Sequence, residues 1–164
     1  MRMRPAGADA ALTLLAAALA ACDSGPADAT ATPDPCALLT PADIQQALGE
    51  PFERSTMPEP SNSYRRCTYD NAGHLREVFV DIFPDGRAYD ALKTAAEDID
   101  VQPVDVPGVG DGAFRTRNAH MVIKFTGYAL EVVAVGFDSG DPLVATDAAN
   151  AAVEQLGRAA AARV

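Results

Sequence analysis

The chain has 164 residues, of which 48% are hydrophobic and 22% charged, a composition typical of a folded protein and too apolar for full disorder. Its formal net charge is -10, and it becomes -11 when residues 1–21, which contain two arginines and one aspartate, are left out. Phosphate groups repel such a chain, and Arg65, Arg66, Arg115 and Arg117 are too few for a basic stripe. We therefore expect no nucleic-acid partner and no flat binding to anionic lipid.

The N-terminus has the pattern of an export signal. A short cationic segment, Met1 to Arg4, precedes the uncharged apolar run 10–19, which is too short to cross a bilayer as a helix. The following Leu19-Ala20-Ala21-Cys22 resembles the lipobox of bacterial lipoproteins at all four positions. That resemblance implies cleavage between Ala21 and Cys22, diacylation of the Cys22 thiol, and a lipid-anchored protein on the extracytoplasmic face of the cell membrane. The alternative is ordinary secretory cleavage that leaves Cys22 as a free thiol.

The segment after Cys22 is small and polar. Residues 23–35 read DSGPADATATPDP and contain no large apolar side chain, so we expect a flexible tether over 22–35. The remainder, 36–164, has the usual size of one domain.

Two cysteines remain once Cys22 is assigned to lipid. In an exported chain, a structural disulfide between Cys36 and Cys67 is the economical solution, worth roughly 3 to 4 kcal/mol on the chain-entropy model. A redox-active pair would need a C-x-x-C spacing, which is absent. His74 and His120 are the only histidines and show no metal-ligand spacing, so we expect neither a metal nor a cofactor.

The first half of the domain predicts one helix, a hairpin and a second helix. Thr40 fits an N-cap, Pro41 the first helical position, and Asp43 the capping-box position of a helix over 41–48 that Gly49 ends. Strands are predicted over 64–69 and 75–83, with Val78, Val80 and Ile82 on one face and Glu77 and Asp81 on the other. A helix follows over 87–99, with Tyr89, Leu92, Ala96 and Ile99 on one stripe.

The second half predicts further strands and a closing helix. A strand edge is expected over 101–106, strands over 113–117, 119–126 and 128–137, and a helix over about 142–162 capped by Asp141. The order α-β-β-α-β-β-β-α with short connections predicts an α+β fold, a single antiparallel sheet with about three helices packed on it.

Three sequence blocks add a family resemblance. Residues 35–43 (PCALLTPAD), 67–69 (CTY) and 106–113 (VPGVGDGA), in this order behind the lipobox, resemble a family of actinobacterial lipoproteins whose domain has no assigned function. The resemblance implies that Cys36 and Cys67 form the family's conserved bridge and that the host is an actinobacterium. It implies no enzyme activity.

Motifs that could carry chemistry have simpler interpretations. The glycines of 108–112 precede a strand-like segment rather than a helix, so they predict a tight turn and not a phosphate-binding loop. Residues 138–141 lack the regular oxygen ligands of a calcium loop and are interpreted as a helix cap. Glu97, Asp98, Asp100 and Glu131 are interpreted as solvated charges, and no residue is assigned a catalytic role.

Three functional hypotheses follow. The first is a non-catalytic binding or interaction module that contacts another envelope protein or a small apolar ligand, which predicts an apolar cavity between the sheet and a helix. The second is a cell-envelope hydrolase with an unrecognised site, which predicts ionisable groups converging in one cleft. The third is a structural accessory subunit of an envelope complex.

Overall fold

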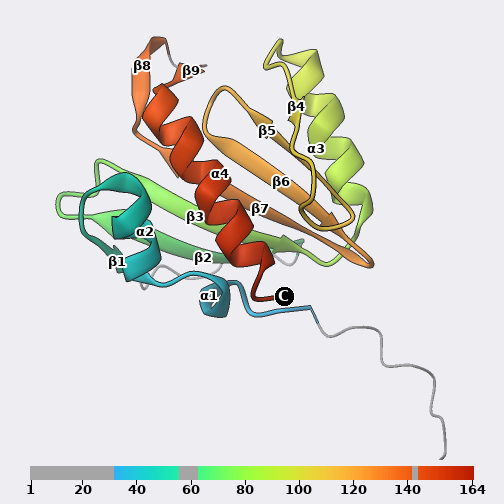
Figure 1. Ribbon diagram of the computed structural model, residues 1–164, viewed down its shortest axis with the longest axis horizontal. Coiled ribbons are helices and arrows are strands. Elements are labelled where there is room, and N and C mark those ends of the chain that lie inside the picture. Colours follow the sequence, from blue (N-terminus) through green and yellow to red (C-terminus); the bar gives the residue numbers. More distant parts are fainter. Residues whose placement is uncertain (1–31, 56–62, 142–143) are drawn as a thin grey trace, which may run out of the picture.

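The computed structural model describes residues 32–55, 63–141 and 144–164 (Figure 1). The predicted signal peptide, Ala21, Cys22 and most of the predicted tether lie outside these residues. None of the helices in the described ranges combines the length and hydrophobicity needed to span a lipid bilayer.

One antiparallel sheet of seven strands organises the molecule, and helices pack on it, which confirms the predicted α+β fold. Its strands, in spatial order, are β1 (Phe52–Arg54), β2 (Arg65–Asn71), β3 (Glu77–Phe83), β7 (Tyr128–Val135), β6 (His120–Phe125), β5 (Gly112–Thr116) and β4 (Val104–Asp105). The helices in the described part of the chain are α1 (Pro35–Leu38), α2 (Pro41–Leu48), α3 (Arg87–Asp98) and α4 (Asp147–Ala161). A separate short hairpin joins β8 (Asp138–Asp141) to β9 (Val144–Ala145).

The main core lies between one face of the sheet and α1, α2 and α4. Figure 1 shows α4 running across the sheet, with α2 beside it. Val78, Val80 and Ile82 are fully buried on this face, as their alternation in the sequence predicts. Gly157 lets α4 come close to β6, because a Cβ at that position would collide with the sulfur of Met121.

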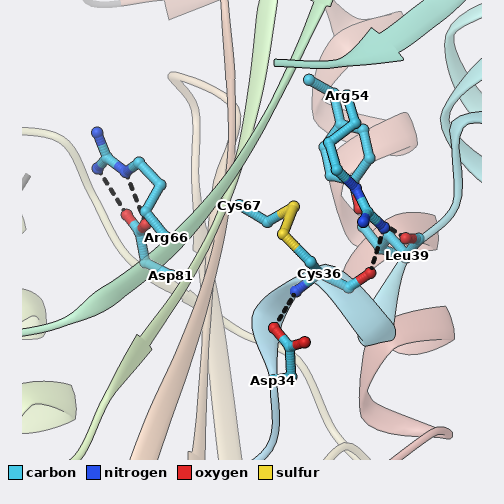
Figure 2. Close-up of a disulfide and its surroundings, with 8 residues drawn as sticks. Asp34, Cys36, Leu39, Arg54, Arg66, Cys67 and Asp81 are labelled. Atoms are coloured by element: carbon cyan, nitrogen blue, oxygen red, sulfur yellow. Dashed lines mark hydrogen bonds and ion pairs between the residues drawn. A yellow bond between two sulfur atoms is a disulfide. The ribbon is translucent and has the colours of Figure 1, made fainter. Parts of the chain in front are cut away.

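The disulfide ties the first helical turn to the sheet. Cys36 of α1 is bonded to Cys67 of β2, with a Cα–Cα distance of 5.0 Å, as predicted (Figure 2). Arg54 of β1 donates a hydrogen bond of 2.7 Å to the Cys36 carbonyl, and the Tyr69 hydroxyl donates one of 2.6 Å to the Leu39 carbonyl. These contacts fix the N-terminal segment against the strands that begin the sheet.

The predicted cap of α2 is confirmed, and its Asp43 carboxylate also binds Arg163, which follows α4. The Thr40 side chain accepts a hydrogen bond from the Asp43 amide, and the Asp43 carboxylate accepts one from the Thr40 amide. Arg163 donates two further hydrogen bonds to the Asp43 carboxylate, of 2.7 and 2.9 Å. These bonds, with that of Thr40, hold the pKa of Asp43 well below its usual range, against the smaller opposing effect of burial.

Several boundaries differ from the prediction. The closing helix begins at Asp147 rather than 142 and is capped by Thr146, because Asp138–Asp141 and Val144–Ala145 pair as β8 and β9 instead of forming a helix cap. The short elements α1 and β1 were not predicted, and Pro35, assigned to the tether, is buried as the first residue of α1. Ile99 is 56% exposed because α3 ends at Asp98 and Asp100 takes a positive φ of 58°.

We expect removal of the disulfide to cost roughly 3 to 4 kcal/mol of unfolding free energy, because the unfolded chain regains the freedom of a loop of about 30 residues. The double variant Cys36→Ser/Cys67→Ser compared with the parent by urea unfolding measures this cost. The parent in reducing buffer serves as the matched control and should show the same loss. Equal unfolding midpoints for the double variant and the oxidised parent would contradict the expectation.

Asp43→Asn should lower the unfolding free energy by about 1 to 2 kcal/mol at pH 7. The folded-state pKa of Asp43 is depressed, so its stabilisation is complete above the unfolded pKa of about 4 and is lost as the pH falls below it. The deficit of the variant should therefore shrink between about pH 5 and pH 2 in urea titrations. Asp147→Asn, which removes an exposed first-turn carboxylate from α4, is the control. A deficit that does not change with pH would refute the assignment.

Candidate functional site

Of the helices in the described ranges, α3 is the one that packs on the second face of the sheet. A smaller apolar cluster of Tyr89, Phe114, Val122 and Ala129 fills the contact between α3 and strands β5 to β7. Phe83, Ala88 and Leu92 pack around it. The helix contacts β6 and β7. Farther along this face, β2 and β3 carry Arg66 and Asp81 together with Phe79 and Phe83.

An apolar cleft opens beside this cluster, between the C-terminal half of α3 and the sheet. Its volume is about 220 Å³. The apolar lining consists of Leu92, Ala95, Ala96, Ile99, Val101, Phe114 and Val122. The polar lining consists of Thr116, Asn118, His120 and Glu131. The cleft therefore has an apolar body along α3 and a polar end at the β5–β6 turn.

Glu131 is the central polar group of the cleft. The residue is 7% exposed, and its Oε1 lies 3.1 Å from Nδ1 of His120, whose side chain is 36% exposed. Within the described part of the chain, Oε2 of Glu131 accepts no hydrogen bond. Thr116 and Asn118 complete the polar end with a hydrogen bond between their side chains. One carboxylate oxygen is thus available to a hydrogen-bond donor inside a largely apolar cleft.

A buried ion pair lies next to Glu131 on the same face. Asp81 of β3 stands opposite Glu131 of β7 in the strand register, and Arg66 of β2 stands opposite Asp81. Arg66 donates two hydrogen bonds of 2.7 Å to the carboxylate of Asp81, which is 1% exposed (Figure 2). The guanidinium also lies over the rings of Phe79 and Tyr64, at 4.3 and 5.0 Å from their centroids.

Two opposing effects act on the pKa of Asp81 in this ion pair. Burial raises the pKa of Asp81, and the hydrogen bonds from Arg66 oppose that rise. The same bonds raise the pKa of Arg66. Because Arg66 and Asp81 satisfy each other bidentately, the pair is neutral as a unit, and Glu131 is the acidic group that the cleft presents.

The structure brings together some predicted residues and separates others. Glu131, interpreted as a solvated charge, is buried, because β7 is the central strand and is covered on both faces. Glu97, Asp98 and Asp100 are exposed around the end of α3, as expected. His120 lines the cleft, whereas His74 is at the β2–β3 turn, with Nδ1 2.7 Å from Asp70. The glycines of 108–112 lead from β4 into β5, so the predicted turn is confirmed.

The residues that line the cleft were not predicted from the sequence, although one signal was present. Strand β7 reads YALEVVAV, so Glu131 is the single charge in an otherwise apolar strand. A lone carboxylate in such a run indicates a buried polar group, because a strand covered on both faces has no solvated side. Among the described residues, no group of three or more His, Cys, Asp or Glu side chains is arranged to hold a metal ion.

Comparison with known proteins adds no family or fold assignment: no protein-family model, no curated protein and no solved structure matches the chain.

Proposed function

We propose that this chain is a membrane-anchored extracytoplasmic lipoprotein whose single domain is a non-catalytic binding module for a small, largely apolar ligand. The observation that carries the proposal is the cleft between α3 and the sheet, with apolar walls and a few polar groups gathered at one end. Ligand sites commonly combine apolar walls with a small number of polar groups that orient the ligand. The binding hypothesis predicts a cavity of this kind between the sheet and a helix.

The size of the cleft supports a small ligand. A cavity of about 150 Å³ lined by aliphatic and aromatic side chains accommodates a benzene-sized molecule. A volume of about 220 Å³ therefore suits an eight-carbon chain or a substituted ring. It is too small for a folded partner, and a phospholipid tail would fit into it only in part.

The anchor is the second part of the proposal. The lipobox Leu19-Ala20-Ala21-Cys22 and the resemblance to actinobacterial lipoproteins support acylation of Cys22. Ten residues separate Cys22 from Thr32, so this link spans at most roughly 35 Å. The anchor would therefore hold the domain within a few nanometres of the membrane surface.

The cleft lies away from the anchored end of the domain. Pro33, near the first described residue, lines a hollow with Phe125, Thr126 and Tyr128 at the β6–β7 turn. His120, at the polar end of the cleft, is at the opposite end of β6, a strand length of roughly 20 Å away. This separation supports uptake of the ligand from the aqueous side of the envelope.

Replacement of Cys22 by Ser should abolish lipid attachment and leave an unmodified polypeptide in the aqueous phase after detergent partition. The parent should partition into the detergent phase and carry the added mass of the acyl chains on Cys22. Mass spectrometry of the mature protein and detergent partition of both forms provide the measurement. An unmodified Cys22 in the parent and identical partition of the two proteins would remove the anchor from the proposal.

The cleft should bind octan-1-ol, a neutral probe with an eight-carbon tail, with a dissociation constant near or below about 1 mM. We expect NMR titration of the mature chain carrying Cys22→Ser to shift the methyl signals of Leu92, Ile99 and Val122. Ala96→Leu, which adds bulk to the floor of the cleft, should weaken binding about tenfold or more. Ala159→Leu, a similar change on α4 outside the cleft, is the control.

The titrations of the parent and the two variants decide whether the cleft is a ligand site. Saturable shifts confined to the cleft in the parent and the control, with loss in Ala96→Leu, support a ligand site. Absence of saturable binding in the parent, or equal binding by Ala96→Leu, overturns it.

A further inference from the structure

We infer that the cleft selects ligands with a cationic or strongly donating head, such as a protonated amine on a short apolar chain, and that Glu131 is the residue that receives this head. The inference rests on the proposed function and adds the chemical class of the ligand. It follows from the hydrogen-bonding state of Glu131, from the charge balance of its neighbours, and from the direction in which the apolar walls run.

Glu131 has one carboxylate oxygen that can accept a hydrogen bond from a ligand. The residue is more than nine-tenths buried, and His120 occupies only Oε1. Oε2 accepts nothing from any other residue that the structure describes. Among the described residues no buried side-chain oxygen or nitrogen lacks a hydrogen-bond partner, so Oε2 is open to water in the cleft. A charged donor that replaces this water forms the shorter and stronger bond.

The charge balance selects a cation over an anion. The two ionisable side chains that line the cleft are Glu131 and His120. Behind them, Arg66 is bound bidentately by Asp81, so its positive charge is already compensated. From α3, Lys93 and Asp90 point to other partners, since Lys93 pairs with Asp105 and Asp90 with Lys124. An anionic head at the polar end would lie beside the Glu131 carboxylate, and the repulsion between the two negative charges would weaken binding.

The apolar walls fix the orientation of the ligand. Leu92 and Ala96 from α3 face Phe114 and Val122 from the sheet, and Glu131 lies beside Val122 across the β6–β7 pairing. A head held by Glu131 therefore places its tail between α3 and β5–β6. The binding pose combines one charge-assisted hydrogen bond with burial of a chain of about eight carbons.

Three probes with the same eight-carbon tail test this inference: octylamine, octan-1-ol and octanoate. Binding to the mature chain carrying Cys22→Ser is measured by NMR titration or calorimetry at about pH 8, where an alkylamine is protonated. We expect octylamine to bind at least tenfold more tightly than octan-1-ol, and octanoate to bind most weakly.

Variants separate the carboxylate from the general acidity of the chain. Glu131→Gln should remove the preference for octylamine over octan-1-ol, and a urea-unfolding midpoint close to that of the parent reports that the fold is intact. Glu131→Asp, which keeps the charge, should retain part of the preference. Asp98→Asn removes the same charge from the exposed end of α3 and should retain all of it.

The result that overturns the inference is octanoate or octan-1-ol binding as tightly as octylamine to the parent chain, a comparison that needs no variant. Retention of the full preference by Glu131→Gln, or its equal loss in Asp98→Asn, also overturns it. Octan-1-ol binding without an amine preference would reject the ligand class and leave the proposed function standing. Failure of all three probes to bind would reject both.

Discussion

The structure depends on a mismatch between the width of its sheet and the cover that its helices provide. Seven strands measure roughly 29 Å across, whereas α3 is about 10 Å in diameter, contacts β6 and β7, and is the one described helix on the second face. The first face is closed by α1, α2 and α4 and holds the main core. On the second face, the rings of Phe83 and Tyr64 continue the apolar cluster under α3 toward β2 and β3. The cleft and the charged residues Arg66, Asp81 and Glu131 occur at the boundary of this cluster.

Charged groups at this boundary lose contact with water on folding, and this desolvation raises the free energy of the folded state. Arg66 and Asp81 avoid most of it through two short hydrogen bonds and through aromatic rings beneath the guanidinium. A buried pair of this kind contributes little net stability, and apolar residues in its place would often do as well. Glu131 is less well compensated, since among the described residues one of its two carboxylate oxygens has a partner. The second carboxylate oxygen of Glu131, beside an apolar cleft, is the group that would accept a hydrogen bond from the ligand.

Local patterns made much of the fold predictable, and non-local pairing accounts for the rest. The cap of α2 involves Thr40 and Asp43, which are close in sequence. Apolar and polar side chains alternate in the first part of β3 because one face of the strand packs against the main core. The neighbourhood of β3 and β7 was not readable from the chain, because it joins strands separated by α3 and three other strands. Asp141 and Thr146 are both good caps, and only the pairing of Asp138 with Ala145 decides for Thr146. Burial of Glu131 likewise depends on the two strands beside it.

A crystal structure of the mature chain with octylamine tests the account most directly, because it locates head and tail together. The account predicts the ammonium nitrogen within about 3 Å of a Glu131 carboxylate oxygen, with the chain lying between Leu92 on α3 and Phe114 and Val122 on the sheet. An amine bound elsewhere on the surface, or α3 packed against the sheet with no space between Ala96 and Val122, would contradict it.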